Sequence, residues 1–139
     1  MPDAPLLFDP KALAAHRNRM SDDALFLHRA ARAEVQDRLQ MVKRSFTSVA
    51  VVTPVPEIWR EVFPDACFVT DAEVLALEEE AHDLVIHALC LHCANDPVGQ
   101  LIQCRRALKP DGFFLGLMFG GRTLSGLREA LAEAEVQVT

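Results

Sequence analysis

Apolar residues in the first third of the chain recur at helical spacing. From Leu27 to Phe46 they stand three or four positions apart, with charged residues between them. This pattern is typical of an amphipathic helix that buries one face. Before it, Asp9 followed by Pro10 is a favourable helix start, with aspartate as the cap and proline in the first turn. We therefore predict a helical segment over residues 1–46.

Beyond residue 47, short apolar runs alternate with helical patterns. The runs contain β-branched or aromatic residues, as expected of buried strands, and cover residues 49–52, 67–69, 83–89 and 113–119. Helical patterns follow at 57–63, at 97–108 and from about 123. Strands that alternate with helices predict a parallel sheet covered on both faces. We predict an α/β three-layer sandwich over residues 47–139, with a reduced sheet of four strands.

The helix predicted at 97–108 has its apolar residues on one side. Asn95, Asp96 and Pro97 form its start, and a turn at residues 109–112 separates it from the last strand. Its apolar residues share one face, namely Val98, Leu101, Ile102 and Leu108. The last helix carries an apolar side of its own, made of Leu124, Leu127 and Leu131.

Composition and charge narrow the classes of function. The 139 residues suffice for one domain, and 50% hydrophobic with 24% charged residues is the balance of a folded globular protein. The net charge of -6 provides no basic surface for a phosphate backbone, so no nucleic-acid partner is expected. We find no apolar run long enough for a membrane span and no secretory pattern at the N-terminus, and we predict a cytoplasmic protein.

The distribution of glycine is uneven. All six glycines lie at or beyond Gly99, and the first 98 residues contain none. Only glycine lets a backbone turn tightly against a ligand without an intervening side chain. A glycine-rich cofactor loop in the first half of the chain is therefore disfavoured.

Three motifs in the second half carry a family resemblance. They are Leu91-His92-x-x-Asn95-Asp96, then Leu108-Lys109-Pro110-Asp111-Gly112, then Met118-Phe119-Gly120-Gly121-x-Thr123-Leu124. With them, residues 82–135 resemble class I S-adenosylmethionine-dependent methyltransferases, most of all the branch of mitochondrial complex I assembly-factor methyltransferase-like proteins. That branch is related to the carrier-protein methyltransferase of biotin synthesis. The resemblance implies a Rossmann-like fold, S-adenosylmethionine as cofactor, and a protein or carrier protein as substrate or partner.

The resemblance also implies where a cofactor would bind. Family sites lie at the carboxyl ends of the strands, where this chain has Thr53, Asp71, Ala72, His87 and His92. No residue is assigned a catalytic role, because methyl transfer mainly requires alignment of an already activated cofactor.

The chain departs from the family between residues 53 and 83. Where the family has a Gly-x-Gly loop, residues 53–57 read Thr-Pro-Val-Pro-Glu, and the two prolines remove two amide donors. The segment from Cys67 to Asp83 is shorter than the corresponding part of the family. The two strands that usually complete the fold do not follow. We therefore predict impaired or lost cofactor binding, or alternatively a non-catalytic interaction or assembly protein on this fold.

The residues give less support to metal or redox chemistry. Cys90 and Cys93 form a single C-x-x-C pair without a second pair at zinc spacing, so we predict reduced cysteines and no metal. The related branch is associated with arginine hydroxylation, but His82, Asp83, His87 and His92 show no evident iron-binding triad. A sheet with an unfinished edge is usually covered, and we expect a homodimer.

Overall fold

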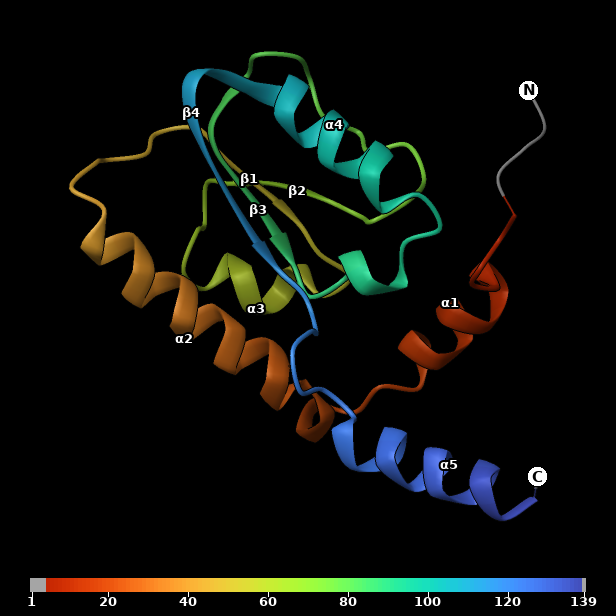
Figure 1. The fold of residues 1–139 in the computed structure, drawn as a ribbon. Coiled ribbons are helices and arrows are strands. Elements are labelled where there is room, and N and C mark those ends of the chain that lie inside the picture. The colour runs from red at the N-terminus through yellow and green to blue at the C-terminus, as the bar shows by residue number, and fades with distance from the viewer. Residues whose placement is uncertain (1–4, 139) are drawn as a thin grey trace.

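The computed structural model describes residues 5–138 and follows the predicted order of elements closely (Figure 1). The N-terminal part contains α1 (Pro10–Asn18), a short 3-10 helix η1 (Asp22–Leu25) and α2 (Phe26–Met41). The rest contains β1 (Val49–Val52), α3 (Pro56–Arg60), β2 (Cys67–Val69), β3 (His82–Ala88), a 3-10 helix η2 (Leu91–Cys93), α4 (Pro97–Ala107), β4 (Leu108–Leu117) and α5 (Ser125–Val138).

The four strands form one parallel sheet in the order β2-β1-β3-β4. The chain moves outward from β1 to β2 and then crosses to the other side of β1 to form β3. In open α/β sheets, such a reversal creates a crevice at the carboxyl ends of the two strands that flank it. The predicted α/β fold with a small parallel sheet is therefore confirmed.

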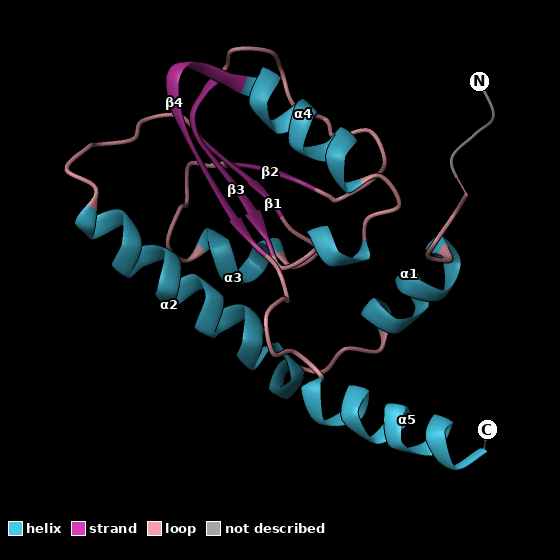
Figure 2. Cartoon of the chain, viewed as in Figure 1, coloured by secondary structure: helices cyan, strands magenta, loops and turns pink. Residues whose placement is uncertain are grey.

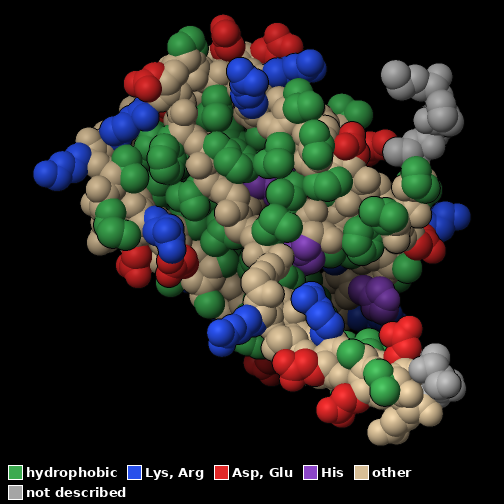
Figure 3. Space-filling model, in the orientation of Figure 1, with side chains coloured by type: hydrophobic (Ala, Val, Ile, Leu, Met, Phe, Trp, Pro, Cys, Tyr) green, Lys and Arg blue, Asp and Glu red, His purple; other side chains and the backbone are tan. Residues whose placement is uncertain are grey.

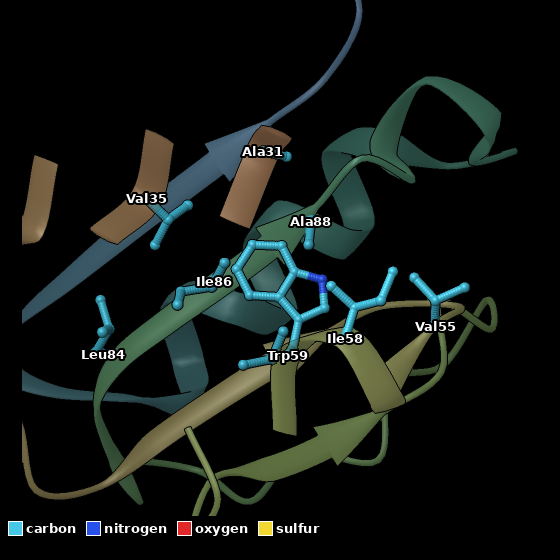
Figure 4. Close-up of a cluster of buried hydrophobic side chains, with 9 residues drawn as sticks. Ala31, Val35, Val55, Ile58, Trp59, Leu84, Ile86 and Ala88 are labelled. Carbon is cyan, nitrogen blue, oxygen red and sulfur yellow. The ribbon is translucent and has the colours of Figure 1, made fainter. Parts of the chain in front are cut away.

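Helices cover both faces of the sheet, with α2 and α3 on one face and α4 on the other (Figure 2). On the first face, the fully buried ring of Trp59 points toward Ile86 and Ala88 of β3 (Figure 4). On the second face, Cys104 and Ala107 of α4 pack in a separate buried cluster. The alternation of side chains along each strand supplies both clusters from the same short sequences.

The apolar side of α4 does not face the sheet. Its apolar side chains are exposed, with fractions of 64% for Val98, 38% for Leu101 and 45% for Ile102. The helix instead buries Gln100, Cys104 and Ala107. Gln100 can lie inside because its side-chain amide is hydrogen bonded to a buried histidine and to backbone carbonyls, which removes the cost of burying it.

Two boundaries also differ from the prediction. Helix α2 ends at Met41, so Phe46 lies beyond it and packs near the first core cluster from a loop. The predicted turn at residues 109–112 is a bulge within β4, because the pairing with β3 shifts between Leu108 and Phe113. Asp111 has a φ of 66° there, and its carbonyl accepts a hydrogen bond from Arg44.

Helix α5 projects away from the sheet beyond α2 (Figure 1). The side chains of Leu124, Leu127 and Leu131 are exposed. Among the described residues, no helix combines the length and the apolar character that crossing a bilayer requires.

Candidate functional site

The five residues predicted to bind a cofactor come together at the carboxyl edge of the sheet. Thr53 follows β1, Asp71 and Ala72 follow β2, His87 lies near the end of β3, and His92 lies in η2. Parallel strands bring these ends to one edge regardless of their distance in the sequence. Their side chains, however, have different surroundings, and each contact limits what the edge can bind.

The loop after β1 has no backbone amide left for a ligand between residues 53 and 56. The Thr53 amide donates to the Val69 carbonyl at 3.0 Å. The Val55 amide donates to the Thr53 hydroxyl oxygen at 3.1 Å. Pro54 and Pro56 have no N–H group. Thr53 itself is buried, so this loop closes on itself instead of forming an open cradle of donors.

His87 lies in the interior with both ring nitrogens in contact with polar groups. Its Nε2 lies 2.7 Å from Gln100 Oε1, and its Nδ1 lies 3.4 Å from Cys90 Sγ. Because the Gln100 amide donates to the carbonyls of Asp71 and Ala72, its oxygen faces the ring and Nε2 carries the proton. Burial lowers the pKa of His87, which keeps the ring neutral.

This network joins the ends of three strands. The Cys90 thiol donates to the Val52 carbonyl at the end of β1, at 3.6 Å. Burial raises the pKa of Cys90 far above its ordinary value, so the sulfur stays a neutral thiol. The contacts of His87 therefore hold the β1, β2 and β3 ends together from inside the sheet.

Asp71 is already paired with a residue from the N-terminal helix. Arg17 of α1 donates two hydrogen bonds to the Asp71 carboxylate, each at 2.7 Å, and the Asp71 side chain is only 6% exposed. Burial lowers the pKa of Arg17, but the hydrogen bond and the charge of Asp71 outweigh this and raise it. Sequence reasoning missed Arg17, because nothing local in α1 indicates which of its basic residues meets a carboxylate 54 positions away.

His92 faces a cavity of about 230 Å³ beside α1. Its ring centroid lies 4.4 Å from that of Phe119. The cavity also contains His28, another residue that sequence reasoning missed, and the Nδ1 atoms of both histidines are buried without a hydrogen-bond partner. Burial lowers the pKa of both rings, and the charge of Arg17 lowers it further, so both are neutral at pH 7.

A second cavity of about 330 Å³ lies next to the first and includes Asp71, Ala72 and Gln100 in its lining. Leu13 and Cys93 line both cavities. Ligand pockets for cofactor-sized molecules typically measure about 300 to 1,000 Å³. Each cavity alone is therefore at or below the lower end of that range.

Metal chemistry has no assembled ligand set in the part of the chain that the structure describes. No group of three or more His, Cys, Asp or Glu side chains there is placed to hold an ion. His82 stands at the start of β3 and His87 near its end, so these two conceivable iron ligands are far apart along the strand. The Asp83 carboxylate instead accepts hydrogen bonds from Thr47 and Ser48.

Comparison with known proteins gives a consistent family assignment. Residues 34–116 match a family model described as a methyltransferase domain. The mitochondrial arginine-hydroxylase NDUFAF5 of Danio rerio is 45% identical over 74 residues, which cover 53% of this chain and 23% of that protein. Malonyl-acyl-carrier-protein O-methyltransferase of Xylella fastidiosa is 35% identical over 72 residues, which cover 52% of this chain and 24% of that protein.

Among solved structures, an S-adenosylmethionine-dependent methyltransferase from Thermotoga maritima superposes with a TM-score of 0.47 at 16% identity. The superposition covers 76% of this chain and 58% of that one. The chain spans about a quarter of the length of the curated relatives described above.

The comparisons contradict the predicted cytoplasmic location. The relatives from Danio rerio, Mus musculus and Homo sapiens, each 45% identical, are all named as mitochondrial proteins. Composition alone does not distinguish between compartments inside a cell.

Proposed function

Because this chain belongs to the class I S-adenosylmethionine-dependent methyltransferase family, we propose that it is a member whose cofactor binding is impaired. The proposal rests above all on the loop after β1. Family enzymes use this loop to approach the cofactor closely with backbone amides. Here the Thr53 and Val55 amides are hydrogen bonded within the chain, and the two prolines supply none.

The second cofactor contact expected of this edge is also occupied. Asp71 follows β2, where an acidic side chain could accept hydrogen bonds from a ligand hydroxyl or amine. Both of its carboxylate oxygens accept hydrogen bonds from Arg17 instead. The residues at the edge therefore do not fit S-adenosylmethionine as they stand, and we derive no methyl-transfer step for this chain.

A non-catalytic role in interaction or assembly is the second candidate. Hydrophobic side chains gather across the middle of the face in Figure 3, over α4 and β4. The exposed residues Val98, Leu101, Ile102 and Met118 belong to these two elements or follow them directly. Exposed apolar patches of this kind mark protein contacts. We propose a protein or a carrier protein as the partner class, and the acidic net charge disfavours nucleic acid.

Titration of S-adenosylmethionine into the protein by calorimetry tests the proposed function. We expect no measurable heat of binding below roughly millimolar cofactor. A dissociation constant in the micromolar range would contradict the impaired site and indicate an active methyltransferase.

A loop variant sharpens this test. Replacing Pro54 and Pro56 by glycine restores two amide donors and removes two rigid rings, so Pro54→Gly with Pro56→Gly should strengthen binding by roughly tenfold. Pro64→Gly, at an exposed site outside the loop, is the matched control and should bind as weakly as the wild type. Equal affinities in all three proteins would mean that the prolines do not impair the site.

A further inference from the structure

Residues 7–20, which we call the strap, cross the carboxyl edge of the sheet and are fastened at both ends. At the first end, Asn95 in the loop before α4 binds the backbone of the strap. Its Oδ1 accepts hydrogen bonds from the Leu7 and Phe8 amides, both at 2.8 Å, and its Nδ2 donates to the Phe8 carbonyl at 3.1 Å. A single side chain thus fixes the strap to a loop that lies 87 positions later.

At the second end, Arg17 and Asp71 form the bidentate ion pair described above, with both distances at 2.7 Å. Arg17 stands one helical turn after Leu13, and Met20 follows at the next inward position. These three side chains are half-buried, whereas most other residues of the strap are exposed. Bidentate arginine–carboxylate pairs are strong and directional, so this contact fixes both the position and the rotation of α1.

Between its two ends, the strap contributes little to the core. Helix α1 has no fully buried residue. It has nine residues, and helices shorter than about 12 residues are marginal in water without a partner surface. Detachment of the strap would therefore remove one contact with the core, that of Met20 with the first buried cluster, and would leave the buried residues of both clusters in place.

The strap covers part of both cavities of the candidate site. Phe8 and Leu13 line the cavity that contains Asp71, whereas Leu13, Arg17 and Met20 line the cavity that contains His92. While Arg17 holds Asp71, α1 lies over both cavities, which share Leu13 and Cys93 in their linings. Once the pair breaks and α1 leaves, the two cavities share one open groove along the carboxyl edge.

We propose that the strap is a gate over this edge, and that Asn95 and the Arg17–Asp71 pair are its two latches. In the closed state, Arg17 occupies the carboxylate that a ligand would otherwise use. Opening therefore frees Asp71 and joins the two cavities in one movement. Insofar as the groove is the remnant of a cofactor site, this inference rests on the proposed function.

Cys93 provides a probe of opening that does not depend on any ligand. It lines both cavities beneath the strap and is only partly exposed. Cys67 is exposed at the start of β2 and serves as an internal reference, whereas Cys104 is buried in the core. The rate at which N-ethylmaleimide modifies each thiol, followed by peptide mass spectrometry, reports the opening of the strap.

The key variants are Arg17→Gln and Asn95→Ala, with Arg19→Gln as the matched control. Arg19 lies at the end of α1 and contacts only an exposed histidine of the same helix by its side chain. We expect Cys93 to react roughly tenfold faster in Arg17→Gln and in Asn95→Ala, and at the wild-type rate in Arg19→Gln. Arg17→Lys, which keeps the charge but not the bidentate geometry, should give an intermediate rate.

Equal Cys93 rates in all these proteins would overturn the gate. So would faster modification of Cys104 together with Cys93, because that would be global unfolding. Calorimetry with S-adenosylmethionine on Arg17→Gln adds a separate readout, in which tighter binding than in the wild type supports the gate and weaker binding opposes it. The labelling result does not depend on cofactor binding, so failure of the proposed function and failure of the gate remain distinguishable.

Discussion

His87 and His92 stand five positions apart, yet their side chains have opposite environments. His87 is fully buried with both nitrogens in contact with polar groups, whereas His92 faces a cavity with one nitrogen unpartnered. Their position near the end of a strand could be predicted, because the strand is indicated by a run of neighbouring apolar residues. Their surroundings could not, because they depend on Gln100 of α4 and on α1. The role of these residues in cofactor binding stays a prediction.

Four buried or half-buried histidines predict how stability changes with pH. Burial lowers the pKa of His28, His82, His87 and His92 below 6.5 in the folded protein. Below that pH the unfolded chain takes up protons that the folded protein does not bind. The free energy of unfolding should therefore be highest above about pH 7 and fall as the pH drops through 6.5.

Urea unfolding at about pH 7.5, 6.5 and 5.5 measures this dependence. His87→Gln removes one of the four groups and should flatten the curve, even if it lowers stability at neutral pH. His16→Gln, on the exposed side of α1, is the control. A stability that is independent of pH across this range would contradict the buried neutral histidines.

At the scale of an element, α4 shows why an apolar pattern alone does not identify the buried face. Val98, Leu101 and Ile102 share one side at helical spacing, and this side is exposed. The buried side contains Gln100 and Cys104, which are less apolar in sequence. The start of the helix was predictable, because Asp96 caps it locally and accepts a hydrogen bond from the Gly99 amide. Which side of the helix faces the sheet depends on the hydrogen-bond partners that Gln100 finds there.

The same substitution on the two sides of α4 tests this orientation. Ile102→Lys should change the free energy of unfolding by less than about 0.5 kcal/mol, because the side chain already meets water. Cys104→Lys would bury an unpaired charge and should cost more than about 3 kcal/mol or prevent folding. Urea unfolding of the two variants measures the difference, and the reverse order of stabilities would contradict this orientation of the helix.

At the scale of the whole molecule, β4 is an edge strand of the sheet. This strand pairs only with β3, so its other edge has no strand beside it in the part of the chain that the structure describes. A groove between α2 and β4 runs along this edge and includes Leu27, Leu115 and Phe119. Unpaired strand edges and exposed apolar grooves favour association.

We therefore predict that this chain forms a homodimer through the β4 side. Light scattering after size exclusion should give twice the mass of the chain. Met118→Lys, directly after β4, should weaken the dimer, whereas Val74→Lys, which is also exposed but follows β2 at the other edge, should not. A monomer at every concentration would contradict the prediction.

Local sequence determined the order and kind of the elements of this protein. Strands such as 49–52 and helix starts such as Asp9-Pro10 depend on neighbours within a few residues, and the pairing of parallel strands then brings their ends to one edge. Only the tertiary structure decided what that edge can do. The pairing of Arg17 with Asp71 and the closure of the Thr53 loop onto β2 join residues distant in sequence, and no local preference specifies such contacts.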